Sequence, residues 1–260
     1  MNTDRTLLSD ADWAVLAPLL PGRAGTRGVT AADNRRFVEA VLWVGRTGLP
    51  WRDLPPHLGQ WHRVFVRFAR WRQAGVWARV LAALQARGRA VGSPRSRQVQ
   101  LDSTTVRAHQ HAAGARKKRA PQALGRSRGG FSTKLHLAGD AAGYPLGFAL
   151  TAGQAGDAPQ AAALLAPHLA PGRLVIADTA YDSDALRGQI AAAGAVAVIP
   201  PKPNRRQPPP LDRAAYRDRN QAERLVNRLK QHRRIATRYD KCADSYLAFV
   251  YARAILLWLK

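Results

Sequence analysis

The chain has 260 residues, enough for one sizeable core and a smaller second module. Its hydrophobic content of 46% excludes a disordered chain, and its single cysteine excludes an internal disulfide and a multi-cysteine zinc site. The formal net charge of +24, from 41 Lys and Arg against 17 Asp and Glu, favours a polyanionic partner, because each cation set against a phosphate releases a condensed counterion. A GC-rich genome would also raise the content of Ala and Arg.

Nucleic acid is the first candidate for this polyanion, and an anionic membrane is the rival. No stretch of the sequence approaches the ~20 consecutive apolar residues of a spanning helix. Residues 1–12 are acidic and polar, unlike a signal peptide, which is basic and then apolar. We therefore expect a soluble, cytoplasmic protein that acts on nucleic acid and has no membrane partner.

Helical periodicity runs through residues 7–90, with the clearest helices over 31–46, 60–74 and 76–87. Ser9 or Asp10 is a candidate N-cap for the first helix. Several short helices with basic faces favour a helix-turn-helix-like module for DNA binding or assembly over residues 1–92. A plain helical cap on the main domain is the alternative.

From residue 93 onward the pattern becomes α/β. Strands are predicted over 99–106, 130–138, 146–152, 173–177 and 196–200, and helices over 158–169, 184–193, 214–234 and 245–259. Three strands followed by alternating helices and strands require the later strands to lie parallel to their neighbours. This order fits a ribonuclease H-like fold over residues 93–260.

Two predicted strands carry an Asp in an otherwise mostly apolar run, at Asp102 and Asp178. A buried carboxylate is costly unless it is paired or binds a cation, and active residues of open α/β sheets gather at strand ends. Asp182 and Asp184 compete with Asp178, but they precede a predicted helix and are better interpreted as N-caps. Asp102 by itself could simply begin a turn.

The third candidate acid, Glu223, lies on the basic helix predicted over 214–234. Arg219 and Lys230 share its helix face, and Tyr216 lies three residues before Arg219. Glu223 by itself could be an ordinary salt-bridge partner of Arg219. The order of the three acids on these elements is what favours catalysis.

Three carboxylates suit phosphodiester chemistry. Two metal ions about 3.5–4 Å apart activate the attacking water and stabilise the leaving oxygen, and Mg²⁺ needs only a few carboxylates besides water and substrate oxygens. We therefore expect two Mg²⁺ ions per active site, with Mn²⁺ able to substitute. Arg219 and Lys230 would hold phosphates beside these ions.

Tyr216, Arg219, Glu223 and Lys230 meet the pattern Tyr-x2-Arg-x3-Glu-x6-Lys without a gap. At these residues the chain resembles DDE transposases of bacterial insertion sequences, specifically the insertion-sequence-five family. Further similar stretches lie at residues 47–55, 101–109, 127–136 and 177–184.

The resemblance covers nearly the whole chain. It implies a ribonuclease H-like catalytic domain, catalytic and metal-binding roles for Asp102, Asp178 and Glu223, and Mg²⁺ dependence. It also implies recognition of terminal inverted repeats, double-stranded DNA partners at element ends and target, a homodimer or higher assembly, and a place at the bacterial nucleoid. One departure is that Thr179 follows Asp178, where the family often has Lys or Arg. The spacing of 45 residues from Asp178 to Glu223 (223 − 178) leaves no room for the β-insertion of some relatives.

Further DNA contacts are expected from basic residues outside this motif. Residues 110–129 are interpreted as a flexible basic loop that orders on DNA, the alternative being a solvated loop. Residues 202–212, rich in Pro and Arg, suggest a second arm that follows phosphates. The expected DNA-binding residues are Arg107, His109, Arg116, Lys117, Lys118, Arg119, Arg126, Arg128, Lys134, Lys202, Arg205 and Arg206, together with Tyr216, Arg219 and Lys230.

The sequence therefore predicts a DNA transposase that binds terminal inverted repeats and catalyses metal-dependent strand cleavage and strand transfer. A structure-selective ribonuclease H-like nuclease and a catalytically silent, transposase-derived DNA-binding regulator are the alternatives.

Overall fold

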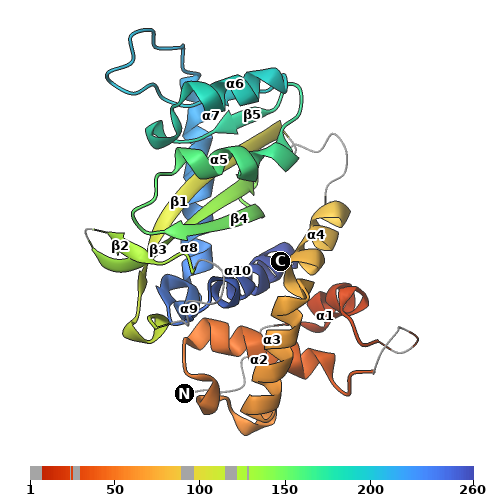
Figure 1. Cartoon of the computed structure of the whole chain (residues 1–260). Helices are drawn as coiled ribbons and strands as arrows, with labels where there is room; N and C mark the ends of the chain where they lie inside the picture. Colours follow the sequence, from red (N-terminus) through yellow and green to blue (C-terminus); the bar gives the residue numbers. More distant parts are fainter. Residues whose placement is uncertain (1–7, 24, 26–29, 89–96, 115–121, 128) are drawn as a thin grey trace. The chain divides into compact units, whose positions relative to one another are not determined.

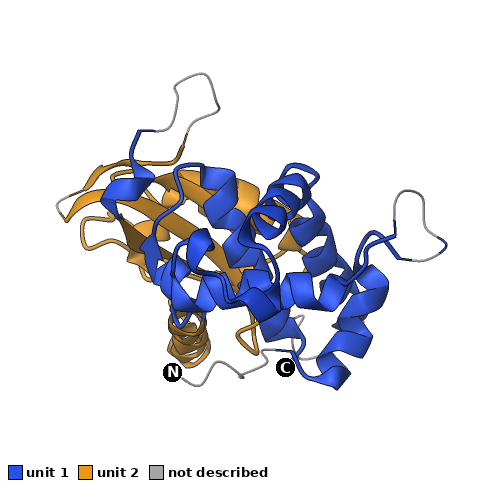
Figure 2. Ribbon diagram, turned by 90° about the horizontal axis from the view of Figure 1, so that it is seen from below, with its two compact units in different colours: residues 1–88, 109–119, 229–260 blue, residues 89–108, 120–228 orange. Residues whose placement is uncertain are grey.

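The computed structural model describes residues 8–23, 25, 30–88, 97–114, 122–127 and 129–260. The chain forms two compact units (Figure 2). Unit 1 comprises Met1–Gly88, His109–Arg119 and Leu229–Lys260, and unit 2 comprises Arg89–Ala108 and Ala120–Arg228. The functional division at residues 92 and 93 stays a prediction.

Unit 1 is mainly helical (Figure 1). Its helices are α1 (Asp10–Leu16), α2 (Asn34–Thr47), α3 (Trp61–Gln73), α4 (Val76–Gly88), α9 (Arg233–Ala236) and α10 (Ala243–Trp258), and it also holds strand β7 (Thr237–Arg238). Short 3-10 turns are η1 (Ala17–Leu19), η2 (Trp51–Asp53), η3 (Pro56–Leu58) and η5 (Gln110–Ala112). The four helices expected in the N-terminal region are therefore present.

Local signals explain where these helices begin and end. Ser9 caps α1 in a reciprocal capping box, since its hydroxyl accepts from the Asp12 amide and the Asp12 carboxylate accepts from the Ser9 amide, both at 3.1 Å. Helix α2 ends at Gly48, whose φ of 73° is the left-handed conformation that glycine adopts without strain.

Helix α10 is the centre of the unit 1 core, because it is apolar almost all round and packs against α2, α3 and α4. Phe249 on α10 stacks on Phe68 of α3 with ring centroids 4.8 Å apart, and Trp51 lies 5.8 Å from Phe249. Aromatic side chains of this size bury much apolar surface, which is the main driving force for packing these helices.

Unit 2 is built on a mixed sheet (Figure 1). Its strands are β1 (Gln98–Ala108), β2 (Gly125–Ser127), β3 (Gly130–Asp140), β4 (Pro145–Ala152), β5 (Leu174–Ile176) and β6 (Val196–Val198). Strands β1, β3 and β4 pair antiparallel, while β1, β5 and β6 pair parallel. An antiparallel meander with two further strands added parallel to its first strand is the ribonuclease H-like arrangement. The expected fold class is therefore confirmed.

Helices cover both faces of this sheet. They are α5 (Ala158–Leu165), α6 (Asp184–Ala192), α7 (Arg213–Tyr216) and α8 (Asn220–Lys230), with 3-10 turns η6 (Ala166–His168), η7 (Thr179–Tyr181) and η8 (Arg217–Arg219). A Cβ atom at Gly139 of β3 would lie 3.1 Å from Leu225 of α8, and one at Gly147 of β4 would lie 3.1 Å from Leu164 of α5. Gly147 pairs with Ala138, the neighbour of Gly139, so α8 and α5 lie on opposite faces.

Two expectations were wrong in detail. The single helix predicted over 214–234 is α7, η8, α8 and α9 in succession, because a 3-10 turn interrupts it at Arg217–Arg219 and a second break follows Lys230. The loop expected over 110–129 contains η5 and strand β2 in its described part.

Among the described residues, no helix combines the length and the apolar character needed to span a membrane.

Candidate active site

The register of two parallel strands brings Asp102 and Asp178 to the same level of the sheet. Gln100 of β1 pairs with Ile176 of β5, and each Asp lies two residues beyond that pair. Parallel partners point to the same face and side chains alternate, so both carboxylates project from one face at the carboxyl end of β5. Asp102 also accepts a hydrogen bond from the Ser103 amide at 2.8 Å, and Asp178 accepts one from the Ala180 amide at 2.9 Å.

Helix α8 contributes the third acid, and one guanidinium group faces all three. Nη2 of Arg219 lies 3.9 Å from Asp102 Oδ1 and 3.8 Å from Asp178 Oδ2, while its Nη1 lies 2.5 Å from Glu223 Oε1. Asp102 lies on β1, and Asp178 follows β5 after one intervening residue. Arg219 is the last residue of η8, and Glu223 lies in the first turn of α8. Residues far apart in the sequence thus form one cluster in unit 2.

Exposure differs among the three acids and sets their electrostatics. The Asp102 side chain is 12% exposed, against 37% for Asp178 and 54% for Glu223. Burial raises the pKa of Asp102 above its ordinary value; the Ser103 amide and Arg219 oppose this rise, while the negative charges of Asp178 and Glu223 add to it. Asp102 therefore depends most on a neighbouring cation to stay ionised.

The donor set of this cluster fits a hard divalent cation, since carboxylate oxygens from three elements already surround one positive charge. As they stand, the acids are not gathered closely enough to hold an ion: no such group of three His, Cys, Asp or Glu side chains occurs in the described part of the chain. Arg219 lies within 4 Å of all three acids and partly neutralises their negative charge. A metal ion bound by the same acids would neutralise this charge in place of the guanidinium.

Comparison with known proteins identifies the family. Residues 94–259 match the family model described as "Transposase DDE domain", which covers more than half of the chain. The chain belongs to the DDE transposase family. Residues 8–81 match a second model, described as "Putative transposase of IS4/5 family (DUF4096)", which agrees with the insertion-sequence resemblance. DDE transposases use divalent metal ions.

Individual proteins are similar to parts of this chain. A Brucella ovis protein named "Putative transposase for insertion sequence element IS6501" is 42% identical over 130 residues, which are 50% of this chain and 99% of that protein. "Uncharacterized protein y4sN" of Sinorhizobium fredii is 41% identical over 112 residues, 42% of this chain and 83% of its own. A solved piggyBac transposase synaptic complex with hairpin DNA has a TM-score of 0.42 at 13% identity, covering 80% of this chain and 50% of its own.

Two further motif residues of this DDE transposase, Tyr216 and Lys230, lie at the two ends of the segment that carries Glu223. Tyr216 ends α7, and burial raises the pKa of its phenol, which is also influenced by Arg219 and Asp178. Lys230 is the last residue of α8, seven residues beyond Glu223, and is half-buried.

The expected DNA-binding residues differ in how freely their charge is displayed. Arg107 on β1 and Arg126 on β2 are exposed. His109 is the N-cap of η5: its Nδ1 accepts from the His111 amide at 3.2 Å, and its ring centroid lies 5.1 Å from that of Tyr239. The predictions for Arg116, Lys117, Lys118, Arg119 and Arg128 fall outside the described residues.

Lys134 is engaged within unit 2. Its Nζ lies 3.0 Å from Asp157 Oδ1 and donates to the Ala155 carbonyl at 2.7 Å. His136 belongs to the same network, with Nδ1 3.6 Å from Asp157 Oδ1 and Nε2 2.8 Å from Thr151 Oγ1. Burial lowers the pKa of His136, partly opposed by Asp157. No motif in the sequence marks this network, because Asp157 stands in a loop just before α5.

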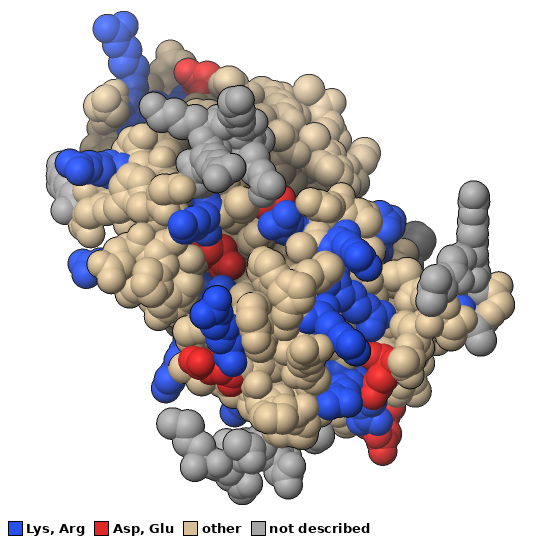
Figure 3. Space-filling view, turned by 60° about the horizontal axis from the view of Figure 1, so that its bottom comes forward, with Lys and Arg blue, Asp and Glu red and all other residues tan. Residues whose placement is uncertain are grey.

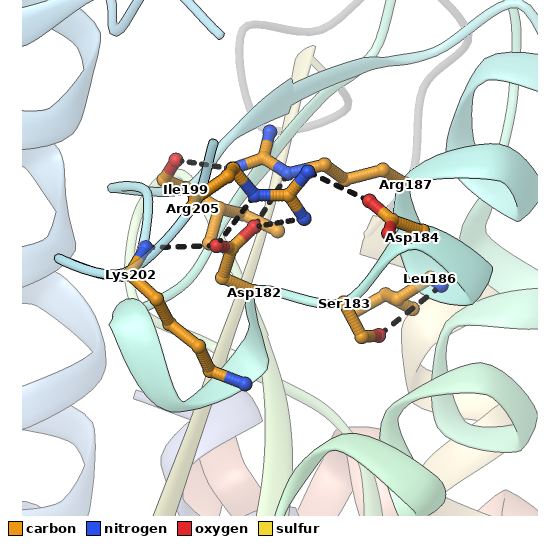
Figure 4. Close-up of polar contacts among 8 residues, drawn as sticks. All are labelled: Asp182, Ser183, Asp184, Leu186, Arg187, Ile199, Lys202 and Arg205. Atoms are coloured by element: carbon orange, nitrogen blue, oxygen red, sulfur yellow. Dashed lines mark hydrogen bonds and ion pairs between the residues drawn. The ribbon is translucent and has the colours of Figure 1, made fainter. Parts of the chain in front are cut away.

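Asp182 forms a second network that the sequence analysis missed (Figure 4). Its side chain is fully buried and accepts hydrogen bonds from Arg187 Nε at 2.7 Å, from both Arg205 Nε and Nη2 at 3.0 Å, and from the Lys202 amide at 2.8 Å. Burial would raise the pKa of Asp182, but these hydrogen bonds outweigh it and hold that pKa well below its ordinary value.

The N-cap interpretation of Asp182 and Asp184 was therefore wrong. Ser183 caps α6 by accepting from the Leu186 amide at 3.3 Å, and Asp184, in the first turn, pairs with Arg205 at 2.7 Å. Two carboxylates thus share Arg205, and these ion pairs attach the Pro-rich segment 202–212 to the start of α6. Lys202 and Arg206 are exposed there, and the Lys202 side chain points away from Asp182 (Figure 4).

Proposed function

We propose that this DDE transposase binds the terminal inverted repeats of its element, cleaves DNA strands there and joins the freed ends to target DNA. The observation that carries the proposal is the cluster of Asp102, Asp178 and Glu223 around Arg219. Three acids from three elements that converge on one place repel one another, and such a cluster is typical of a site that binds cations during function.

In this proposal Asp102, Asp178 and Glu223 hold two Mg²⁺ ions, and Mn²⁺ can substitute. The ions would supply an activated water and stabilisation of the leaving oxygen. Asp102 is the most buried of the three acids, and its backbone is fixed by pairing on β1. It would therefore be the fixed ligand, while the more exposed Asp178 and Glu223 adjust.

The basic residues of the motif would hold the scissile phosphate. Arg219 presents a planar fork of donors that matches a phosphate, and Lys230 presents a point charge. Tyr216 keeps its phenol proton at neutral pH, as an ordinary tyrosine does, and burial raises its pKa further, so it can donate a hydrogen bond to a phosphate oxygen.

DNA would also contact residues outside this cluster. Residues 1–92 would act in DNA binding and assembly, residues 93–260 in catalysis, and a homodimer or larger assembly would pair two DNA ends. Arg107, Arg126, Lys202 and Arg206 are exposed cations that can contact phosphates without losing a partner among the described residues. Lys134 and Arg205 would contact DNA only in competition with their carboxylate partners.

The test is a strand-cleavage assay with Mg²⁺ on DNA that carries the element's own ends. We expect cleavage at the end boundary, loss of cleavage in Asp178→Ala and Glu223→Ala, and retained DNA binding in both. Asp244→Asn is the control, since it removes an exposed carboxylate of unit 1 that pairs with Arg72 and should leave cleavage unchanged.

Each other outcome points elsewhere. End-specific binding without cleavage would favour the silent regulator. Cleavage directed by DNA shape, without end specificity or joining, would favour the nuclease. Cleavage at the wild-type rate in Glu223→Ala would show that the acid assignment is wrong.

A further inference from the structure

Helix α3 of unit 1 carries basic side chains that the site in unit 2 does not use. Its apolar side chains Val64, Phe68 and Trp71 are buried. Arg63, Arg67 and Arg70, spaced four and three residues apart, share a face, and α3 contains no acidic residue. On the face drawn in Figure 3, Lys and Arg side chains gather with fewer Asp and Glu among them.

A groove runs along this arginine face. Arg63, Arg67 and Arg70 line it from α3, and the small, uncharged Thr30, Ala31 and Ala32 line it from the segment before α2. The described residues that line the groove include no carboxylate, and Asp33, outside this lining, is the acid that stabilises the charged form of Arg67. Three like charges within two turns of a helix repel one another, so a groove of this composition favours an anionic occupant.

The central arginine of the face is fixed in position. The Arg67 guanidinium stands 4.3 Å from the Phe37 ring centroid and 5.0 Å from that of Trp71, and donates to the Asp33 carbonyl at 3.4 Å and to the Asn34 side chain. Burial lowers its pKa, but an arginine stays charged at any physiological pH. A fixed, partly desolvated cation in the groove attracts an anion more strongly than a fully solvated one.

The outer two arginines are free to bind. Arg63 and Arg70 are exposed, and within the described part of the chain no hydrogen bond or ion pair involves their guanidinium groups. They are seven residues apart, a rise of about 10.5 Å along the helix. One DNA strand carries a phosphate about every 3.4 Å of axis, so this distance spans roughly three phosphate intervals.

We propose that Arg63, Arg67 and Arg70 of α3 form a phosphate-binding face for duplex DNA. The inference rests on the proposed function, which supplies DNA as the polyanion. Guanidinium forks match phosphate oxygens, and the spacing of Arg63 and Arg70 matches successive phosphates of one strand, so the proposed contacts are with the sugar–phosphate backbone. An arginine that instead bound a guanine edge would change the preference for element ends. Its role is to position DNA along unit 1 independently of sequence.

The test measures binding of the full chain to duplex DNA by fluorescence anisotropy from about 0.05 to 0.3 M salt. Each phosphate contact contributes about 0.9 to the slope of log K against log salt, so Arg63→Ala with Arg70→Ala should lower the slope by about 1.8. At ~0.15 M salt the same loss corresponds to about 30-fold weaker binding. The affinity ratio of element ends to scrambled duplex should stay unchanged.

Two matched double variants control for charge and fold. Arg79→Ala with Arg87→Ala removes the same charge from α4 and should leave the slope within about 0.5 of wild type. Arg63→Lys with Arg70→Lys keeps the charge and should keep the slope. A slope unchanged in the alanine variant, or a changed preference for element ends, would overturn the phosphate face. If wild-type protein binds no duplex DNA at any salt concentration, the proposed function fails as well.

Discussion

Arg219 balances the acid cluster in the metal-free protein, and its removal should strengthen metal binding. Its guanidinium lies 3.9 Å from Asp102 and 3.8 Å from Asp178. At about 4 Å two unit charges interact by about 1 kcal/mol in bulk water and about 4 kcal/mol at an effective dielectric of about 20. Since the Asp178 and Glu223 side chains are 37% and 54% exposed, solvent screens the cluster and the value near water applies. A divalent ion at a similar distance from the guanidinium carries twice the unit charge. Removal of Arg219 therefore relieves about 2 kcal/mol of repulsion between the guanidinium and the ion.

We therefore expect Arg219→Ala to bind Mn²⁺ about 10- to 30-fold more tightly than wild type in the absence of DNA, because about 1.4 kcal/mol is a tenfold change in affinity. The assay is isothermal titration calorimetry or Mn²⁺ electron paramagnetic resonance. Strand cleavage should fall in the same variant, since the phosphate fork is lost. Tighter metal binding with weaker cleavage is a split that mere structural damage would not produce.

The control is Arg224→Ala, which removes the same charge from an exposed position one residue beyond Glu223. Its Mn²⁺ affinity should stay close to wild type. Arg219→Lys keeps a cation near the acids and should change the affinity less than Arg219→Ala. Equal or weaker Mn²⁺ binding by Arg219→Ala would refute the view that this guanidinium occupies the place of the metal charge.

Two further predictions concern stability. Burial, with Arg253 and Arg46 nearby, lowers the pKa of His232 to about 3. Below about pH 6.5 the unfolded chain therefore binds a proton at His232 that the folded chain does not bind. This contribution is present above pH 6.5 and is lost as the pH falls: urea unfolding should show about 2 kcal/mol less stability at pH 5 than at pH 7, and His232→Gln should remove this part of the slope. Asp182→Asn should lower the free energy of unfolding by about 3 kcal/mol, because it leaves the partly buried guanidinium groups of Arg187 and Arg205 without their charged partner. Asp184→Asn, at an 88% exposed carboxylate, should cost less than about 1 kcal/mol, and equal losses in the two variants would contradict the buried network.

Local patterns in the sequence were sufficient for most elements. The N-cap at Ser9, one of two candidates, the helices of the first 88 residues and the strands that carry or precede Asp102 and Asp178 follow from capping residues, periodicity and short apolar runs, which act between near neighbours. The order of strands and helices was sufficient for the fold class, because parallel strands need crossover connections. The sequence also named the acids and Arg219, although their catalytic role remains a proposal.

Only the tertiary structure decided which charges meet. The β1–β5 register places Asp102 beside Asp178, and the 3-10 turn before α8 carries Arg219 to both. Arg205 stands in a segment rich in Pro and Arg, and from the sequence it was expected to bind DNA phosphates. In the folded chain it instead pairs with Asp182 and Asp184. Periodicity reports which face of an element is buried, but the partner of a charge is set by long-range pairing and burial, which no local pattern records.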